Sequence, residues 1–132
     1  MTDVQAHELE VAADLEAPRT ARRFVAGVLG RWAAVGDLVD RAQLLVSELV
    51  SNAVQYGDGP IHVIVGPGSR TATFRVEVCN TGLGRPVVRH PATDEISGRG
   101  LQIVEELSAS WGSAVRDGAT SVWFEMHADA PL

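Results

Sequence analysis

The segment from residue 37 to residue 56 constrains the fold more than any other part of the chain. Asp37 is a good N-cap residue and Asp40 is favourable in a first helical turn, whereas the GDGP sequence at 57–60 is a strong breaker. Between these signals, apolar side chains cover most of a helical surface: Leu44, Leu45, Leu49, Val50, Ala53 and Val54. A helix this apolar must be largely buried, so the rest of the chain has to cover it.

The residues before this helix predict one strand and one further helix. Residues 7–13 alternate loosely and could form an edge strand. Pro18 stands where a helix could begin, and residues 21–35 carry apolar side chains at helical spacing until Gly36 ends the helix.

The residues after the breaker predict two β-hairpins. Residues 61–65 and 71–79 are rich in β-formers and are joined by a turn-forming Gly-Pro-Gly-Ser sequence. Near the end of the chain, residues 111–116 and 120–126 form a second pair around an Asp-Gly turn.

Between the hairpins, residues 81–100 have almost no apolar periodicity, which in a small domain is typical of a binding loop or lid. An amphipathic helix is predicted over 101–108. The expected fold is therefore an α+β two-layer sandwich, in which three helices cover one face of a mostly antiparallel mixed sheet.

Composition limits the class of protein. A chain of 132 residues that is 45% hydrophobic and 21% charged fits one compact domain over 1–132. The net charge is −6 and no Lys/Arg cluster stands out, which disfavours nucleic acid as a partner. The single cysteine, Cys79, cannot form an internal disulfide and is expected to be a small buried strand residue. No apolar run reaches the ~20 residues of a membrane span and the N-terminus is not a signal peptide, so we expect a cytoplasmic protein.

Two polar residues of the long helix, Glu48 and Asn52, are four positions apart and share a face within about 40°. They form either an ordinary polar stripe facing solvent or part of a site that opens onto a cavity. In the functional interpretation, Asn52 offers its carboxamide oxygen to Mg²⁺, which prefers oxygen ligands and shares them with phosphates. Glu48 then orients or deprotonates a hydroxyl that attacks a γ-phosphate.

Two glycine-rich turns suggest the rest of a nucleotide pocket. The turn at 80–84 (NTGLG) leaves a strand, and its glycines allow positive φ and close approach of the backbone to a flat ligand. The turn at 98–100 (GRG) enters a helix, so free N–H groups and the helix dipole favour a phosphate there. Arg99 could add a charged contact to phosphate or could be an exposed lid residue. Taken singly, each turn is also compatible with a plain loop.

The three motifs, ELVSNAV at 48–54, NTGLGRP at 80–86 and GRGLQIV at 98–104, resemble the N, G1 and G2 boxes of the Bergerat ATP-binding fold. That fold is shared by gyrase, heat-shock chaperone, histidine-kinase and mismatch-repair ATPases. Within it, ELVSNAVQYG, GRGLQIVEELSASWG and the closing TSVWFEM look most like the short actinobacterial anti-sigma-factor serine/threonine kinases. The resemblance covers the chain from about residue 17 to residue 126.

The resemblance implies a role for each matching residue. Asn52 would bind Mg²⁺ and Glu48 would be the catalytic base. The residues expected to contact ATP are Asn80, Gly82 and Gly84 on the adenine side, Gly98, Arg99, Gly100 and Leu101 on the phosphate side, and Thr120 in the late strand beside the base. The lid over 85–97 is expected to be mobile without nucleotide.

The chain departs from the family pattern at Asn80, where relatives have an aspartate that accepts a hydrogen bond from the adenine 6-amino group. The Asn80 carbonyl can still accept that bond, but the charge is lost and its NH₂ needs an acceptor, which adenine N1 could supply. An unpaired buried amide costs about 1–3 kcal/mol. An amide also discriminates less against guanine than a carboxylate does.

Two functions are expected from the resemblance. The first is an anti-sigma factor that phosphorylates a STAS-type anti-anti-sigma protein on serine or threonine with Mg-ATP, and that holds a sigma factor inactive until this partner displaces it. By analogy with the anti-sigma kinases, a homodimer is possible. The second is a non-catalytic module of the same fold that binds a partner with little or no nucleotide, for which Asn80 is the main support. A sensor histidine kinase is disfavoured, because neither early helix contains a histidine.

The asparagine at position 80, in place of the family aspartate, leads to a first prediction. ATP binding is expected to be weaker than is usual in the family, with relaxed choice between ATP and GTP. Titration calorimetry of the protein and of Asn80→Asp with both nucleotides measures this, and an aspartate variant that gains no ATP affinity contradicts it.

Overall fold

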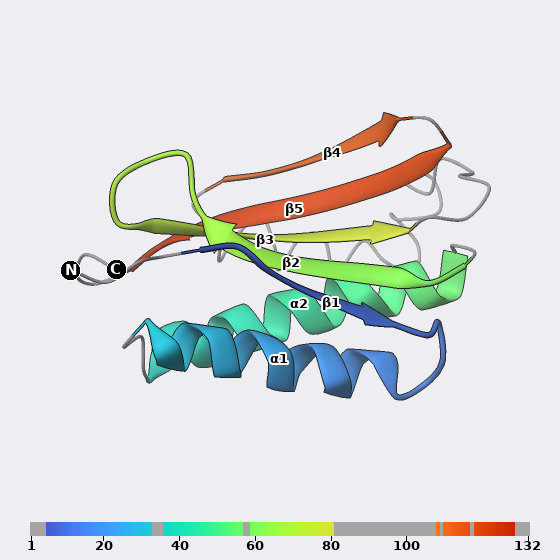
Figure 1. Ribbon diagram of the computed structural model, residues 1–132, viewed down its shortest axis with the longest axis horizontal. Coiled ribbons are helices and arrows are strands. Elements are labelled where there is room, and N and C mark those ends of the chain that lie inside the picture. Colours follow the sequence, from blue (N-terminus) through green and yellow to red (C-terminus); the bar gives the residue numbers. More distant parts are fainter. Residues whose placement is uncertain are drawn as a thin grey trace.

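The computed structural model describes residues 5–32, 36–56, 59–80, 108, 110–116 and 118–128. These residues form two helices and five strands, shown along the chain in Figure 1. In chain order the elements are β1 (His7–Val11), α1 (Ala17–Arg31), α2 (Asp37–Tyr56), β2 (Ile61–Pro67), β3 (Thr73–Asn80), β4 (Ser110–Arg116) and β5 (Ala119–His127).

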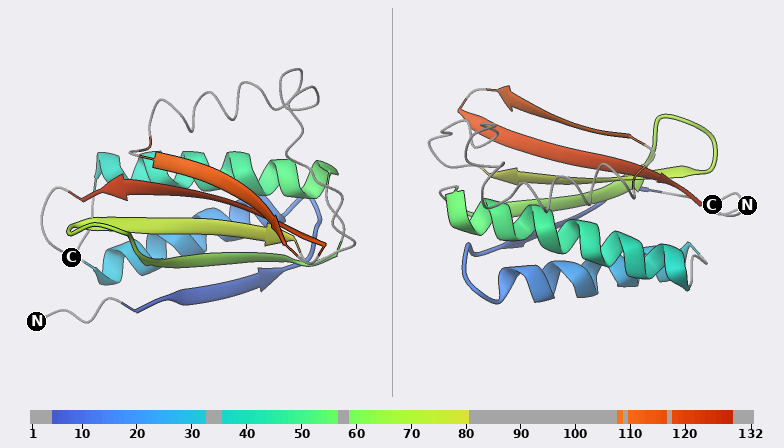
Figure 2. Two further views of the ribbon diagram at one scale, coloured as in Figure 1. Left: turned by 90° about the horizontal axis from the view of Figure 1, so that it is seen from above. Right: turned by 180° about the vertical axis from the view of Figure 1, so that it is seen from behind.

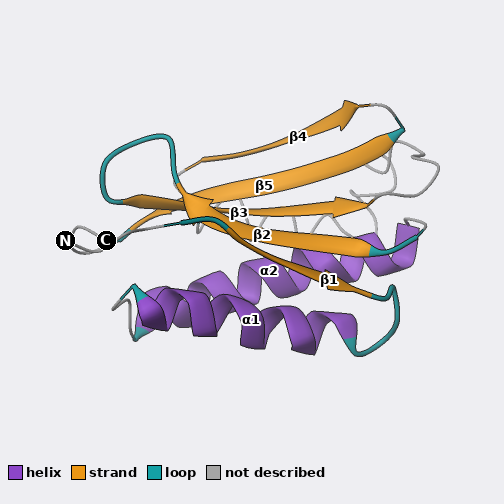
Figure 3. Cartoon of the chain, in the orientation of Figure 1, coloured by secondary structure: helices purple, strands orange, loops and turns teal. Residues whose placement is uncertain are grey.

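The strands form one sheet in the order β1-β2-β3-β5-β4, and α1 and α2 lie together against one of its faces (Figures 2 and 3). The predicted two-layer α+β sandwich, with its helices on one face, is confirmed. In the described part of the chain, neither helix combines the length and apolar character needed to cross a membrane.

The expected mixed sheet and third helix need correction. Every strand pair in the described sheet is antiparallel. The reason is that α1 runs back along the sheet and α2 returns, so β2 starts at the end where β1 stopped (Figure 1). The described residues hold two helices rather than three, and the helix predicted over 101–108 lies almost wholly outside them.

The boundaries differ from the prediction mainly around α1. This helix begins at Ala17, four residues earlier than expected, because Pro18 is tolerated in a first helical turn. Asp37 is the first residue of α2 rather than its N-cap, and its carboxylate lies 2.9 Å from Nε of Arg41. The carbonyl of Gly36 accepts hydrogen bonds from the N–H groups of Val39 and Asp40.

The core lies between the helices and the sheet. Strand residues alternate between the two faces, so neighbouring strands stack their inward side chains in rows, such as Val65 beside Val76 and Val76 beside Phe124. The largest fully buried side chains of the two layers are Val25, Leu29, Leu45, Val46, Val50, Ile61, Val63, Val65, Phe74, Val76, Phe124 and Met126. One side of α2 is buried against the sheet and the neighbouring α1, which confirms that this segment is a core helix, although Leu44 lies on its exposed side.

The other face of the sheet is stabilised by contacts of Trp123 and Glu125. The Trp123 ring lies over Gly112 of β4, and the Arg75 guanidinium carbon is 4.3 Å from the ring centroid. Glu125, which is 4% exposed, accepts hydrogen bonds from the backbone N–H and the hydroxyl of Ser69 at 3.1 and 2.9 Å. These bonds hold the β2–β3 hairpin loop against the sheet.

Two glycines of α1 generate a stability prediction. A Cβ added at Gly27 or Gly30 would meet no atom within 4 Å. Glycine disfavours a helix relative to alanine by about 1 kcal/mol, so Gly27→Ala and Gly30→Ala should each raise the free energy of unfolding by about that amount. Urea denaturation measures the change.

Gly112→Ala serves as the matched control. Its added Cβ would lie 2.7 Å from Cζ2 of Trp123, so this variant should be less stable than the parent. Helix variants without any gain in stability would mean that the open space at Gly27 and Gly30 is occupied in solution.

Candidate functional site

Asn80 and Thr120 face each other at one end of the sheet. Asn80 is the last residue of β3, and its Cα pairs with Thr120 in β5 and with Ile61 in β2. Both polar side chains are buried on the face that packs against the helices, with exposed fractions of 6% for Asn80 and 2% for Thr120. Two residues predicted to contact the base therefore lie side by side on adjacent strands.

Glu48 and Asn52 lie on the flank of α2 that faces away from α1. The opposite flank is marked by Ser47, whose hydroxyl accepts a 2.8 Å hydrogen bond from Arg22 of α1. Successive helical residues are rotated by about 100°, so Glu48 lies about 100° and Asn52 about 140° around the helix axis from Ser47. Both side chains are partly buried, so they lie at the border between the core and the surface.

A hydrogen bond joins the end of β3 to α2 beside Asn52. Nδ2 of Asn80 donates to the backbone carbonyl of Ala53 at 3.4 Å. Ala53 is among the last four residues of α2, whose carbonyls have no partner inside the helix. The Asn80 amide therefore supplies a donor that the helix end needs, and Asn52, Asn80 and Thr120 come together at one end of the two layers.

The Asn80–Ala53 bond removes the predicted cost of burying the Asn80 amide. Its NH₂ has an acceptor in the protein, so the expected penalty for an unpaired buried amide does not apply. With Nδ2 directed at Ala53, Oδ1 is the atom of this side chain that can accept a hydrogen bond. In this orientation Asn80 presents the same kind of atom that the aspartate of relatives presents.

Asn52 suits a magnesium ion that is shared with a phosphate group. Its carboxamide oxygen is a hard ligand of the type that Mg²⁺ prefers. Among the described residues, no group of three or more His, Cys, Asp or Glu side chains could hold a metal ion alone. An ion bound at Asn52 would complete its coordination with phosphate oxygens and water, which is usual for Mg²⁺.

The remaining predicted residues lie outside the described part of the chain. These are Gly82, Gly84, Gly98, Arg99, Gly100 and Leu101, together with the lid over 85–97. The adenine-side pair and the α2 pair thus have a described position, and the phosphate-side turn stays a prediction.

Cys79 lies next to Asn80 but on the opposite face of the sheet. Its side chain is half-buried rather than fully buried, and its thiol donates to the Glu77 carboxylate, which also accepts from the Ser121 hydroxyl. Burial, together with the negative charge of Glu77, raises the pKa of the Cys79 thiol. The thiol therefore stays protonated near neutral pH and is a poor nucleophile.

Ala53 is the residue of this site that was not predicted, because its contribution is a backbone carbonyl. Its closeness to the end of α2 marked it as a carbonyl in need of a donor. Which donor reaches it depends on how β3 docks against the helix, and spacing along the chain does not contain that information.

Comparisons with known proteins agree with this fold. A family model described as the histidine kinase-like ATPase domain matches residues 11–126. A crystal structure of the RsbU and RsbW domains of Rv1364c from Mycobacterium tuberculosis has a similar fold, with a TM-score of 0.72 at 20% sequence identity. The match covers 96% of this chain and 32% of that one. No curated protein matches the chain.

The Asn80 bond generates a prediction about stability and pH. Asn80→Asp removes the donor and places a carboxylate against the Ala53 carbonyl, which should cost about 1–3 kcal/mol at neutral pH. The buried site raises the pKa of the introduced carboxyl, and its protonated form can donate to Ala53. Protonation of this carboxyl therefore adds to the free energy of unfolding. The added stability is fully present below the carboxyl's unfolded pKa and is lost as pH rises through its folded pKa.

Urea unfolding of the parent, Asn80→Asp and Asn80→Ala at pH 5 and pH 8 tests this. The alanine variant should be destabilised by a similar amount at both pH values, whereas the aspartate variant should be worse at pH 8. An aspartate variant as stable as the parent at pH 8 would show that the Asn80–Ala53 bond does not hold the helix end.

Proposed function

The chain belongs to the histidine kinase-like ATPase domain family, and from this membership we propose that it is an ATP- and Mg²⁺-binding regulatory protein. More specifically, it would act as an anti-sigma factor with serine/threonine kinase activity toward a STAS-type anti-anti-sigma partner. The observation that supports this most is the joining of Asn80 to α2 beside Asn52, with Thr120 paired opposite Asn80. The neighbour that contains an RsbW domain supports the fold of such a protein.

The base side of the proposed site depends on Asn80. Its Oδ1 would accept a hydrogen bond from the adenine 6-amino group, while Nδ2 stays with the Ala53 carbonyl. Guanine carries a carbonyl oxygen at the corresponding position, and two acceptors would then face each other. The proposed site therefore favours adenine over guanine, in contrast to the relaxed choice expected from an amide that is free to turn.

The phosphate side depends on the α2 pair. Asn52 would hold a magnesium ion that neutralises phosphate charge, and Glu48, one turn earlier, would accept the proton of the attacking hydroxyl. Glu48 is partly exposed at the edge of the layer, so a hydroxyl on another protein could reach it. The receiving hydroxyl would belong to a serine or threonine of the partner.

The non-catalytic module is the second candidate function. It is favoured by the neutral Asn80, because the charge that relatives use on the base side is missing. In that account the Asn80–Ala53 bond is a structural link that closes the end of α2, and the protein acts by binding its partner.

Titration with Mg-ATP and Mg-GTP separates the two functions. Ligand at 100 times its Kd should stabilise the native state by about 2.7 kcal/mol. Mg-ATP should raise the melting temperature of the parent, Mg-GTP should do so much less, and Asn52→Ala should lose most of the ATP effect. No shift at millimolar Mg-ATP from well-folded protein would favour the non-catalytic module.

Transfer of phosphate is tested separately with a purified STAS-domain protein and radiolabelled ATP. Glu48→Gln should retain the thermal shift with Mg-ATP and lose phosphate transfer, since it keeps the shape of the side chain and removes the base. Equal transfer by Glu48→Gln and the parent would contradict the role assigned to Glu48.

A further inference from the structure

Helix α1 concentrates positive charge in an acidic protein. It contains Arg19, Arg22, Arg23 and Arg31 and no acidic residue, whereas the whole chain has a net charge of −6. The helix therefore carries +4, and the rest of the chain carries −10. Three of these arginines, Arg19, Arg22 and Arg23, already lie within five residues of the sequence, and Arg31 follows in the last turn of the helix.

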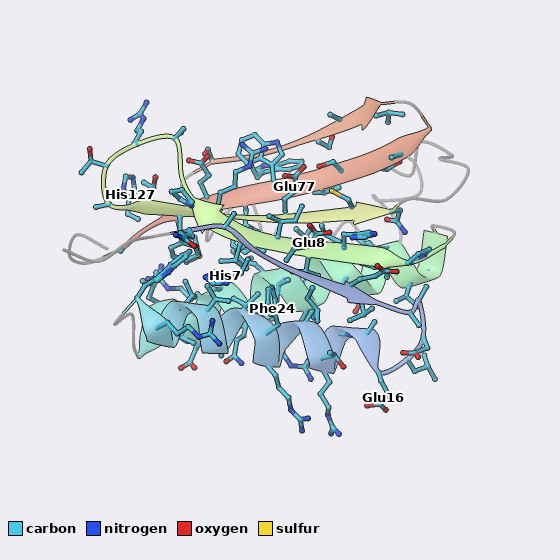
Figure 4. All side chains as sticks on the ribbon, viewed as in Figure 1. His7, Glu8, Glu16, Phe24, Glu77 and His127 are labelled. Carbon is cyan, nitrogen blue, oxygen red and sulfur yellow. The ribbon has the colours of Figure 1, made fainter. Side chains whose placement is uncertain are left out.

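The outward face of α1 forms a regular ridge. We call the α1 ridge the row of residues spaced by four: Leu15, Arg19, Arg23, Gly27 and Arg31. All five are exposed, and Leu15, just before the helix, has an exposed fraction of 92%. Long side chains that end in nitrogen project from α1 away from the sheet in Figure 4. Residues at this spacing form the ridges by which helices pack against one another.

The ridge breaks several local rules for a stable helix. Gly27 and the neighbouring Gly30 disfavour the helix, and neither has an atom near the position of its missing Cβ. Arg19 and Arg23 place like charges four positions apart, which also destabilises a helix. Within the described residues, no ion pair joins Arg19, Arg23 or Arg31 to a carboxylate.

Arg31 is favourable in the last turn of the helix, but no contact in the described fold accounts for Arg19, Arg23 and Gly27, and such departures from local rules are typical of functional surfaces. The second arginine, Arg22, is different, because it turns inward and donates to Ser47 of α2. The inward arginine thus has a role in packing, whereas the ridge arginines have none within the described residues.

The shape and charge of the ridge select one kind of occupant. Gly27 leaves a gap between Arg23 and Arg31, where a second helix could cross close to the α1 axis, at about −50° for ridges of this spacing. The arginines on both sides of the gap favour carboxylates there. Leu15 lies between the exposed carboxylates of Asp14 and Glu16, so that end of the ridge favours an apolar side chain without a carboxylate beside it. A second copy of this chain packed ridge on ridge would bring arginines together.

We infer that the α1 ridge is a docking surface for an acidic amphipathic helix of a partner protein. The ridge is separate from the proposed nucleotide site on the far flank of α2. Docking would bury Leu15, pair the ridge arginines with carboxylates of the partner helix, and seat a small residue of that helix against Gly27.

The test uses a synthetic acidic peptide of about 18 residues, held helical by a side-chain cross-link on the face opposite its glutamates, because like charges four positions apart destabilise an isolated helix. Its glutamates are spaced by four on one face, with an alanine at the crossing point and a leucine at one end. A scrambled peptide of the same composition, which cannot gather its glutamates on one face, is the control. Binding to the full chain is followed by NMR and calorimetry.

Matched variants separate docking from general attraction between charges. Arg23→Glu should weaken binding of the acidic helix by about tenfold or more, whereas Arg70→Glu should weaken it by much less. Arg70 is exposed on the β2–β3 loop and undergoes the same change of charge. Gly27→Leu should also abolish binding while α1 stays folded, and Gly27→Ala should retain most of it.

Several outcomes would overturn the inference. Equal binding of the scrambled peptide, or equal losses in Arg23→Glu and Arg70→Glu, would show only general attraction. A dimer by sedimentation that Arg23→Glu dissociates would assign the ridge to a second copy of the chain. Tighter binding of anionic vesicles or DNA, lost in the same ridge variants, would assign it to a membrane or a nucleic acid.

The result is independent of the proposed function. Asn52→Ala should bind the acidic helix as the parent does, and Arg23→Glu should keep the thermal shift with Mg-ATP. A protein that binds the peptide and no nucleotide would retain the ridge and lose the proposed kinase activity.

Discussion

The whole structure depends on the burial of one side of α2 against the sheet and against its neighbour α1. The apolar side of this helix supplies Leu45, Val46, Leu49 and Val50 to the core, so both layers are positioned by contact with it. Burial removes apolar surface from water, which is the largest favourable contribution to folding. The same burial leaves Glu48 and Asn52 at the border of the core, where polar side chains can meet a ligand and still be held by a rigid helix.

The Asn80–Ala53 hydrogen bond connects this architecture to the proposed chemistry. It satisfies a carbonyl at the end of α2, and it also orients the side chain that would face the base. In the proposed site, one amide would serve stability and recognition together. The loss of the family's carboxylate at this position therefore does not imply the loss of a site, because the donor is used by the protein and an acceptor remains for the ligand.

In helix α1, the residues that pack in the core and the residues of the α1 ridge lie on different faces. Its inward residues, including Ala21, Val25 and Leu29, are fully buried, whereas its outward ridge combines exposed arginines with glycines. The inward face accounts for the position of the helix, and the ridge contributes nothing to that packing. A surface that lowers helix stability without a counterpart in the fold is best understood through a partner outside it.

The sequence by itself determined the two-layer class, the order of strands and helices, and the membership of α2 in the core. These follow from local periodicity, because the spacing of apolar residues decides which side of a helix or strand can be buried. The motif residues Asn52, Asn80 and Thr120 could also be named from the sequence, through their likeness to a family. Only the tertiary structure decided that the sheet is antiparallel throughout its described part and that Asn80 meets the Ala53 carbonyl. It also decided that Arg22 of α1 turns inward to Ser47, whereas Arg19, Arg23 and Arg31 are exposed. These features depend on contacts between segments far apart in the chain, and local spacing carries no information about which backbone atom a side chain will meet.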